Sequence, residues 1–421
     1  MDSKDTKHVC VIGAGVSGIC VLRHLSGCKN ISVTAFERSY TFGGLWQYSD
    51  QTTTTDFGFP ATSPVYKTMR TNVPKQLVAF GGIPMDDNLP AFPGQEDVMK
   101  YLEQVVMQCD LLKYMKFHTD IKEVRPSNPH NRYTKWKVTF SDVRHKNAPI
   151  YTEEFDKVIV CNGVNWSPRH PDIEGEKDFQ GYLIHSIRFK HPEYYTGQTV
   201  AVLGASFGGL DTAVHLAGYA KKVYLCYITE KMNNTLPENL IEKNSGFKRI
   251  TKSSVILQNG EELPVDAIIY STGYKYSFPF LPEGMVRWDK NRLITHFYKD
   301  IIPVEYPSIM FMLMPRLITF YPLADQQARF IASVVSGVCQ LPLEGEMKSI
   351  QAHEFKNRPI DGDSQWDYDR EIAELGHFEP LPVVLKKIWD HHFKIWFSEF
   401  VKIRKMSYKI TGTDSYTALE Q

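Results

Sequence analysis

Residues 7–37, KHVCVIGAGVSGICVLRHLSGCKNISVTAFE, read as a buried strand, a glycine-rich turn, a helix and a second strand that ends at an acidic residue. In the pattern G-x-G-x-x-G, Gly13 permits a tight turn, Gly15 lets the backbone approach a pyrophosphate, and Gly18 lets the helix pack closely on the strand. The helix N-terminus offers free N–H groups to phosphates, and Glu37 can bind ribose hydroxyls. This segment therefore predicts a βαβ unit that binds a dinucleotide.

Residues 199–228, TVAVLGASFGGLDTAVHLAGYAKKVYLCYI, repeat the same order of elements. Ser206 replaces the middle glycine, but the turn remains lined by small residues. The second strand ends without an acid, which would favour NAD, and without an arginine, which would favour NADP. Three lysines are the nearest candidates for the missing charge: Lys221, Lys222 and Lys231. We expect NADPH at this turn, with a relaxed choice between NADPH and NADH as the alternative.

The two units predict an α/β fold with two Rossmann-like dinucleotide-binding domains, one inserted into the other. Residues 156–163 and 266–274 are apolar runs that end in glycine turns, and each can return the chain to one nucleotide sheet. The expected domains are a first FAD part over 1–164, an inserted NADPH domain over 165–280, and a second FAD part with C-terminal helices over 281–421. The aromatic-rich segment 386–403 has helical periodicity and is expected to pack in the core.

Composition excludes several classes of protein. Positive and negative charges balance, so neither nucleic acid nor an anionic membrane is expected as a partner. No run approaches the roughly 18 apolar residues of a transmembrane anchor. The seven cysteines include no CxxC pair, which argues against a disulfide framework or a metal site. The polar N-terminus carries no secretory signal, so we expect a soluble, cytoplasmic protein; secretion would require that a signal peptide has been removed.

The segment after Glu37 indicates which dinucleotide occupies the first turn. Arg38 follows directly, and Gly43-Gly44-Leu45-Trp46 comes shortly afterwards. This E-R and G-G-x-W pattern resembles the extended FAD motif of flavoproteins that bind two dinucleotides. A nicotinamide beside a flavin implies hydride transfer. The cysteine spacing argues against a disulfide reductase. A flavin reductase or oxidase, and a non-catalytic flavoprotein-like binding module, stay open as alternatives.

Further motifs make the resemblance specific. Residues 179–189, FQGYLIHSIRF, match F-x-G-x-x-x-H-x-x-x-[YF], residues 66–75 match Y-x-x-L-x-T-N-x-P-K except for Met69, and residues 272–274 are TGY. The chain thus resembles the flavin-containing monooxygenases, closest to insect-type members that include pyrrolizidine alkaloid N-oxygenases. Phe189-Lys190 differs from the tryptophan motif of Baeyer–Villiger enzymes.

The resemblance implies an enzyme that uses NADPH and O2 to N- or S-oxygenate soft nucleophiles through a C4a-hydroperoxyflavin. Tertiary amines such as pyrrolizidine alkaloids, and thioethers, are the implied substrates, and a homo-oligomer is compatible with it. Asn72 is the implied catalytic residue, with its amide near flavin N5. His185 is expected to have a positional or nucleotide-contact role.

The same resemblance, together with the two turns, gives the expected cofactor contacts. Those to FAD are Gly13, Gly15, Ser17, Gly18, Glu37, Arg38, Gly44, Leu45, Trp46, Thr71, Asn72, Val124 (through its backbone, to the adenine), Phe320 and Asp325. Those to the nicotinamide dinucleotide are Ser206, Phe207, Gly208, Gly209 and Asp211.

Overall fold

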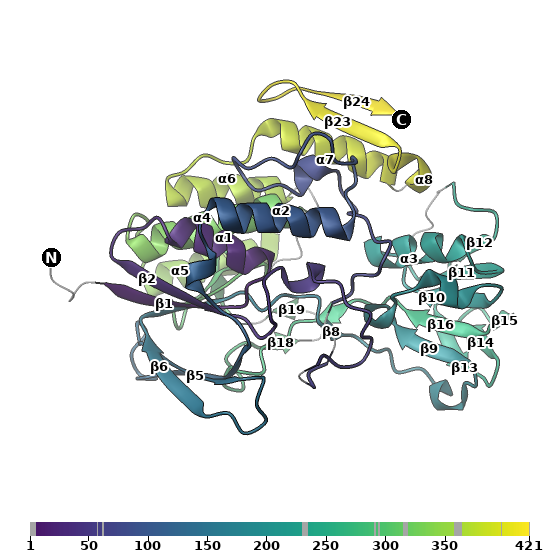
Figure 1. Ribbon diagram of the computed structural model, residues 1–421, viewed down its shortest axis with the longest axis horizontal. Helices are drawn as coiled ribbons and strands as arrows, with labels where there is room; N and C mark the ends of the chain where they lie inside the picture. The colour runs from purple at the N-terminus through teal and green to yellow at the C-terminus, as the bar shows by residue number, and fades with distance from the viewer. Residues whose placement is uncertain are drawn as a thin grey trace.

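Two five-stranded parallel sheets form the frame of the protein (Figure 1). The computed structural model describes residues 6–56, 58–60, 63–229, 235–289, 292–293, 295–314, 319–357, 364–396 and 398–420. The first sheet has the order β22-β7-β1-β2-β3 and the second β12-β11-β10-β16-β9. The strands of the first are β1 (Lys7–Ile12), β2 (Ile31–Phe36), β3 (Met115–Lys116), β7 (Lys157–Val160) and β22 (Ile309–Phe311). Those of the second are β9 (Tyr182–His185), β10 (Thr199–Leu203), β11 (Lys222–Cys226), β12 (Leu240–Lys243) and β16 (Ala267–Tyr270).

Each sheet places its glycine turn at the carboxyl end of its central strand. β1 pairs in parallel with β2 and β7, and β10 pairs in parallel with β11 and β16. Both predicted strand–turn–helix–strand units are confirmed, as are the strands expected within 156–163 and 266–274. The chain returns to the first sheet as β22 only after the second sheet is complete, and β22 lies beside β7.

Helices cover the sheets and supply most of the apolar core. α1 packs against α4, and α4 packs against α6. Buried side chains of α1, α2 and α4 form one cluster with the first sheet, and those of α7 and α8 form another with α3 and the second sheet. The helices are α1 (Val16–Leu25), α2 (Gln95–Gln108), α3 (Phe207–Ala217), α4 (Phe320–Ser336), α5 (Glu344–Asn357), α6 (Ser364–Gly376), α7 (Val383–Trp396) and α8 (Phe400–Ile403).

Smaller antiparallel elements complete the fold. β4 (Thr119–Pro126), β5 (Trp136–Asp142) and β6 (Ile150–Phe155) form a sheet beside β1, and β13 (Phe247–Ile250), β14 (Ser254–Leu257) and β15 (Glu262–Pro264) form a second. Two-stranded pairs are β8 (Ser167–Pro168) with β17 (Tyr274–Lys275), β18 (Trp288–Asp289) with β19 (Arg292–Leu293), β20 (Phe297–Tyr298) with β21 (Ile302–Pro303), and β23 (Met406–Ile410) with β24 (Tyr416–Glu420).

The C-terminal segment bridges the two halves of the molecule. In Figure 1, α7 and the β23–β24 hairpin lie above α2 and extend toward α3. The segment predicted as one core helix over 386–403 forms two helices, α7 and α8, and residue 397 between them lies outside the described residues. Its aromatic face is buried as expected: Trp389 and Trp396 are among the largest fully buried side chains. Across the described residues, no helix combines the length and hydrophobicity that crossing a membrane requires.

Candidate functional site

Steric contacts at the first turn account for its glycines. Gly13 has φ +102°, and a Cβ there would lie 2.6 Å from the carbonyl oxygen of Cys161. A Cβ on Gly18 would lie 2.0 Å from the carbonyl oxygen of Gly13, so helix and turn can meet only without a side chain. Gly15 is the N-cap of α1 and provides no capping side chain. The N–H groups of the first turn of α1 are therefore left for an anionic ligand.

The second turn reproduces this geometry although its motif is altered. Gly204 has φ +110°, and its Cβ would lie 2.4 Å from the carbonyl oxygen of Ser271. A Cβ on Gly209 would lie 1.9 Å from the carbonyl oxygen of Gly204. Ser206 is the N-cap of α3, and its hydroxyl makes no capping hydrogen bond. The replacement of the middle glycine by serine therefore leaves the phosphate-binding geometry of the turn intact.

The Glu37 carboxylate stabilises the first turn through hydrogen bonds. One carboxylate oxygen accepts a hydrogen bond from the Ala14 N–H at 2.8 Å. The other accepts from the N–H and the hydroxyl of Ser39, both at 2.8 Å. The carboxylate thus fixes the turn and the chain beyond β2, and it lines the cavity where a ribose would lie beside the turn.

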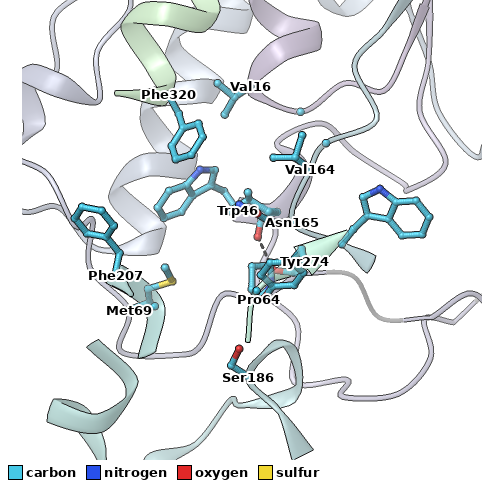
Figure 2. A pocket seen from close by; sticks show the side chains of 18 of the residues that line it. Val16, Trp46, Pro64, Met69, Val164, Asn165, Ser186, Phe207, Tyr274 and Phe320 are labelled. Carbon is cyan, nitrogen blue, oxygen red and sulfur yellow. Dashed lines mark hydrogen bonds between the residues drawn. The ribbon is translucent and has the colours of Figure 1, made fainter. Parts of the chain in front are cut away.

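One cavity of about 2080 Å³ connects the two turns. Its volume exceeds the roughly 300–1000 Å³ of an ordinary ligand pocket, so there is room for more than one large ligand. Figure 2 shows Trp46, Phe207 and Phe320, from three distant segments, around one part of it. The predicted cofactor residues that line this cavity are Gly13, Gly15, Ser17, Glu37, Arg38, Gly44, Leu45, Trp46, Thr71, Asn72, Ser206, Phe207, Gly208, Gly209, Asp211 and Phe320.

Three predicted cofactor residues do not line the cavity: Gly18, Val124 and Asp325. Gly18 allows the close packing of α1 on the first turn. Val124 is fully buried, and its N–H donates to the carbonyl oxygen of Phe280 at 2.8 Å, so that N–H is not available to an adenine. The residues of β4 that line the cavity are Thr119, Asp120 and Ile121.

The Asp325 carboxylate is bound by groups within the protein and does not line the cavity. Its carboxylate pairs with Arg23 at 2.9 Å and His24 at 2.7 Å, and it accepts from the Gly81 N–H at 3.1 Å. Burial alone would raise the pKa of Asp325, but His24 and Arg23 outweigh it and lower that pKa. The carboxylate thus links α1 to α4, and the contact of Asp325 with the cofactor stays a prediction.

Asn72 is held by an arginine from the opposite end of the chain. Arg404 follows α8, and its guanidinium donates to the Asn72 side-chain oxygen at 3.1 Å and to the Thr71 carbonyl oxygen at 2.5 Å. Because the amide oxygen accepts from Arg404, the amide nitrogen is the end left to donate into the cavity. Sequence reasoning missed Arg404, since nothing local links it to the Y-x-x-L-x-T-N-x-P-K segment.

Asp211 completes this cluster from the nicotinamide side. One carboxylate oxygen accepts from Arg404 at 2.5 Å, and the other accepts from the hydroxyl of Tyr66. The Asp211 side chain is only 2% exposed, so the Arg404 charge balances a buried anion. Burial, and then the Asp211 charge, raise the pKa of Tyr66, which keeps its proton on the hydroxyl. Asp211 thus lines the cavity, but both of its oxygens are engaged by protein groups.

His185 holds two segments of the chain together through its ring nitrogens. Its Nδ1 accepts from the Ile187 N–H at 3.2 Å, so its Nε2 donates to the Gly273 carbonyl oxygen at 3.1 Å. Burial lowers the pKa of His185 to about 4, which leaves the ring neutral near pH 7. The ring does not line the cavity. It joins β9 to the loop after β16, which explains why a histidine stands at this place in the motif.

Lys190 directly follows the Phe179–Phe189 motif and was not predicted as a site residue. Its ammonium donates to the carbonyl oxygens of Ser63 and Val65, both at 2.7 Å. Burial lowers the pKa of Lys190 to about 8. The residue lines the cavity and fixes the segment that leads into Tyr66. The feature of the sequence that could have identified Lys190 is its position directly after this motif.

Comparisons with known proteins agree with this geometry. A family model described as "Flavin-binding monooxygenase-like" matches residues 6–232 and 226–372. The chain is 29% identical to "Flavin-containing monooxygenase FMO GS-OX-like 2" of Arabidopsis thaliana over 100% of this chain and 94% of that protein. It is 29% identical to the trimethylamine monooxygenase of Pelagibacter ubique, with coverages of 91% and 90%.

A solved structure of similar identity has the same fold. The S-allyl-L-cysteine S-oxygenase of Allium sativum superposes with a TM-score of 0.84 at 29% identity, covering 95% of each chain. The family match extends over well more than half of the sequence and includes both glycine turns and the segment that carries Asn72. The chain therefore belongs to the flavin-binding monooxygenase family and is an FAD- and NADPH-dependent flavin monooxygenase.

Proposed function

We propose that this enzyme transfers one oxygen atom from O2 to a soft nitrogen or sulfur nucleophile, with Asn72 as the residue that contacts the reacting atoms. The observation that carries the proposal is the single cavity that joins both glycine turns and is lined by Asn72. A continuous cavity allows a nicotinamide and a flavin to meet, and Asn72 supplies a fixed donor where they would meet.

The residues present fit two dinucleotides. The uncapped N-termini of α1 and α3 offer backbone donors to two pyrophosphates. The return of β22 to the first sheet supports a nicotinamide domain over 165–280 inserted between FAD parts over 1–164 and 281–421. FAD would be held by the first turn, Glu37 and Gly44–Trp46, and NADPH by the second turn. When bound, the pair supplies hydride transfer and oxygen activation.

Asn72 has the properties that its proposed task requires. Its amide oxygen is occupied by Arg404, so its nitrogen is oriented to donate and cannot turn without breaking that hydrogen bond. An amide donates over the whole pH range without titrating. A donor fixed before the reaction stabilises developing charge without reorganisation, which is the largest single contribution in many enzymes.

We further propose tertiary amines, including alkaloids of the pyrrolizidine type, as substrates, with thioethers as the sulfur counterpart. The cavity that Asn72 lines also has Met69, Trp46, Phe207 and Phe320 in its wall, which suit a neutral, weakly polar molecule (Figure 2). Asp211, the carboxylate in the Asn72 cluster, is already paired with Arg404 and Tyr66. A protonated amine would find no counter-ion in that cluster and is therefore expected to bind as the free base.

A screen of NADPH consumption tests the function. Trimethylamine, larger tertiary amines, pyrrolizidine alkaloids and thioethers are added in turn, and products are identified by mass. We expect an N-oxide or S-oxide that accumulates with NADPH consumption. Hydrogen peroxide in place of product, with every substrate class, would instead support a flavin reductase or oxidase.

A further inference from the structure

The carboxyl end of β11 is where selectivity between NADPH and NADH is normally decided, because the adenosine ribose lies there. Tyr227, Ile228 and Thr229 follow β11 and line the cavity, and none is charged. Lys222 begins β11 and Lys221 precedes it, so both lie at the opposite end of a five-residue strand, about 16 Å away at about 3.3 Å per residue. Neither lines the cavity, so neither is placed to supply the missing charge. Lys231 lies outside the described residues.

Within the described ranges, four lysine and arginine side chains line the cavity: Arg38, Arg169, Lys190 and Lys394. Arg38 follows Glu37 at the first turn. Lys190 follows the motif after β9, at the far edge of the second sheet, and its ammonium is bound to two carbonyl oxygens. Arg169 lies beside Gly273, after β16, on the side of β10 away from β11. None of these three is on the β11 side.

Lys394, the fourth of these side chains, reaches the cavity from the C-terminal segment. It belongs to α7, whose Trp396 packs on Phe207, the first residue of α3, with 4.8 Å between the ring centroids and the rings tilted by 46°. The carbonyl oxygen of Ser398 accepts from the N–H of Thr235 at 3.3 Å, which ties the end of α7 to the chain leading into β12. β12 begins opposite Val223, near the amino end of β11, so this contact reaches the connection between the two strands. Lys394 and Ser398 line the same cavity as Tyr227, Ile228 and Thr229, which follow the carboxyl end of β11.

The other cation of this region is already neutralised. Lys243 stands opposite Cys226 in the pairing of β11 with β12, but its ammonium is bound to the Glu261 carboxylate at 2.5 Å. Lys394 is exposed at the cavity. Ser398, four residues later, is exposed too, but its hydroxyl donates to the carbonyl oxygen of Lys394 at 3.1 Å. An exposed ammonium in the wall of the cavity suits a terminal phosphate monoester.

We propose that Lys394 binds the phosphate on the adenosine ribose of NADPH, so that NADPH selectivity comes from the C-terminal helix α7 rather than from the end of β11. This inference rests on the proposed binding of the nicotinamide dinucleotide at the second turn. It accounts for the absence of an arginine at the strand end, since the charge is supplied by a segment about 170 residues later in the sequence.

Calorimetric titration of the FAD-loaded protein with NADP⁺ and with NAD⁺ tests the proposal without turnover. Loss of one charge-assisted contact to phosphate should weaken NADP⁺ binding by roughly 10- to 100-fold in Lys394→Ala. NAD⁺ binding should stay within about twofold, and Lys394→Arg should retain preference for NADP⁺. The matched control is Lys387→Ala on the same helix, because Lys387 donates to the Asp414 carbonyl oxygen and does not line the cavity.

Two results would overturn the proposal while leaving the second turn as the nucleotide site. One is unchanged NADP⁺ affinity in Lys394→Ala, and the other is an equal loss of affinity for NADP⁺ and NAD⁺. A wild-type protein that binds neither nucleotide would overturn this inference together with the proposed function on which it rests.

Discussion

Replacing Arg404 by methionine is a demanding test of the cluster that holds Asn72. The change removes hydrogen bonds to Thr71, Asn72 and Asp211, while the methionine can keep part of the packing on Phe92. Breaking a buried ion pair leaves an uncompensated charge and costs about 3–5 kcal/mol. The Arg404 side chain is 19% exposed, and Tyr66 still donates to Asp211, so we expect a loss of about 3 kcal/mol of unfolding free energy.

A double-mutant cycle separates the ion pair from other effects. In Asp211→Asn the buried charge is absent, so adding Arg404→Met should cost only about 1 kcal/mol, the value of ordinary hydrogen bonds. Urea unfolding of the four proteins, followed by tryptophan fluorescence, gives the coupling energy. Additive losses from the two changes would refute the assignment of Arg404 as the counter-ion of Asp211.

The same variant tests the orientation of Asn72. Without Arg404 the amide is free to turn, so Arg404→Met should retain FAD but form less oxygenated product for each NADPH consumed. Arg404→Lys keeps the charge but lacks the planar fork that reaches three acceptors, and it should recover stability more than product yield. Equal recovery of both by lysine would contradict the positional role.

Three other predictions address the site. Asn72→Ala should keep FAD absorbance and lose product yield, whereas normal yield would remove Asn72 from the reaction. Gly209→Ala puts a Cβ 1.9 Å from a carbonyl oxygen and should abolish NADP⁺ binding while FAD stays bound. Gly27→Ala, with no atom within 4 Å of its Cβ, is the control. Intact NADP⁺ binding in Gly209→Ala would contradict the close packing. Product formation from a basic tertiary amine should rise from pH 6 to pH 8, because the fraction of free base increases. His185, whose pKa is lowered to about 4, stays neutral over this range and does not contribute to the rise. A flat profile would count against binding of the free base.

Features set by local chain geometry could be predicted from the sequence. The strand, turn and helix at Gly13 and at Gly204 depend on residues within one βαβ unit, and each glycine is required by a contact with a nearby carbonyl oxygen. The exact end of α1 is less predictable, although Gly27 follows the helix. The C-cap is Ser26 in a right-handed conformation, and Gly27 does not have a positive φ, so the helix ends without a left-handed residue.

Features that depend on tertiary contacts could not be predicted. Arg404 meets Asn72 across 332 residues, and no local pattern indicates that pairing. Val124 does not line the cavity, whereas Thr119, Asp120 and Ile121 of the same strand do, and the sequence of β4 alone does not show which of its residues face the cavity. Asp325 was assigned to the cofactor because its partners Arg23 and His24 lie about 300 residues away in the sequence. In each case the sequence gives the residue type, and only the fold gives its partner.

The most direct measurement of the central claim is the origin of the oxygen atom in the product. Purified enzyme is supplied with NADPH, a tertiary amine and isotopically heavy O2 in ordinary water, and the product is weighed by mass spectrometry. We predict an N-oxide that carries one heavy oxygen atom, with one NADPH consumed for each product molecule. An unlabelled product, or NADPH consumption that yields only hydrogen peroxide with amines and thioethers alike, would contradict the assignment of this chain as a working monooxygenase.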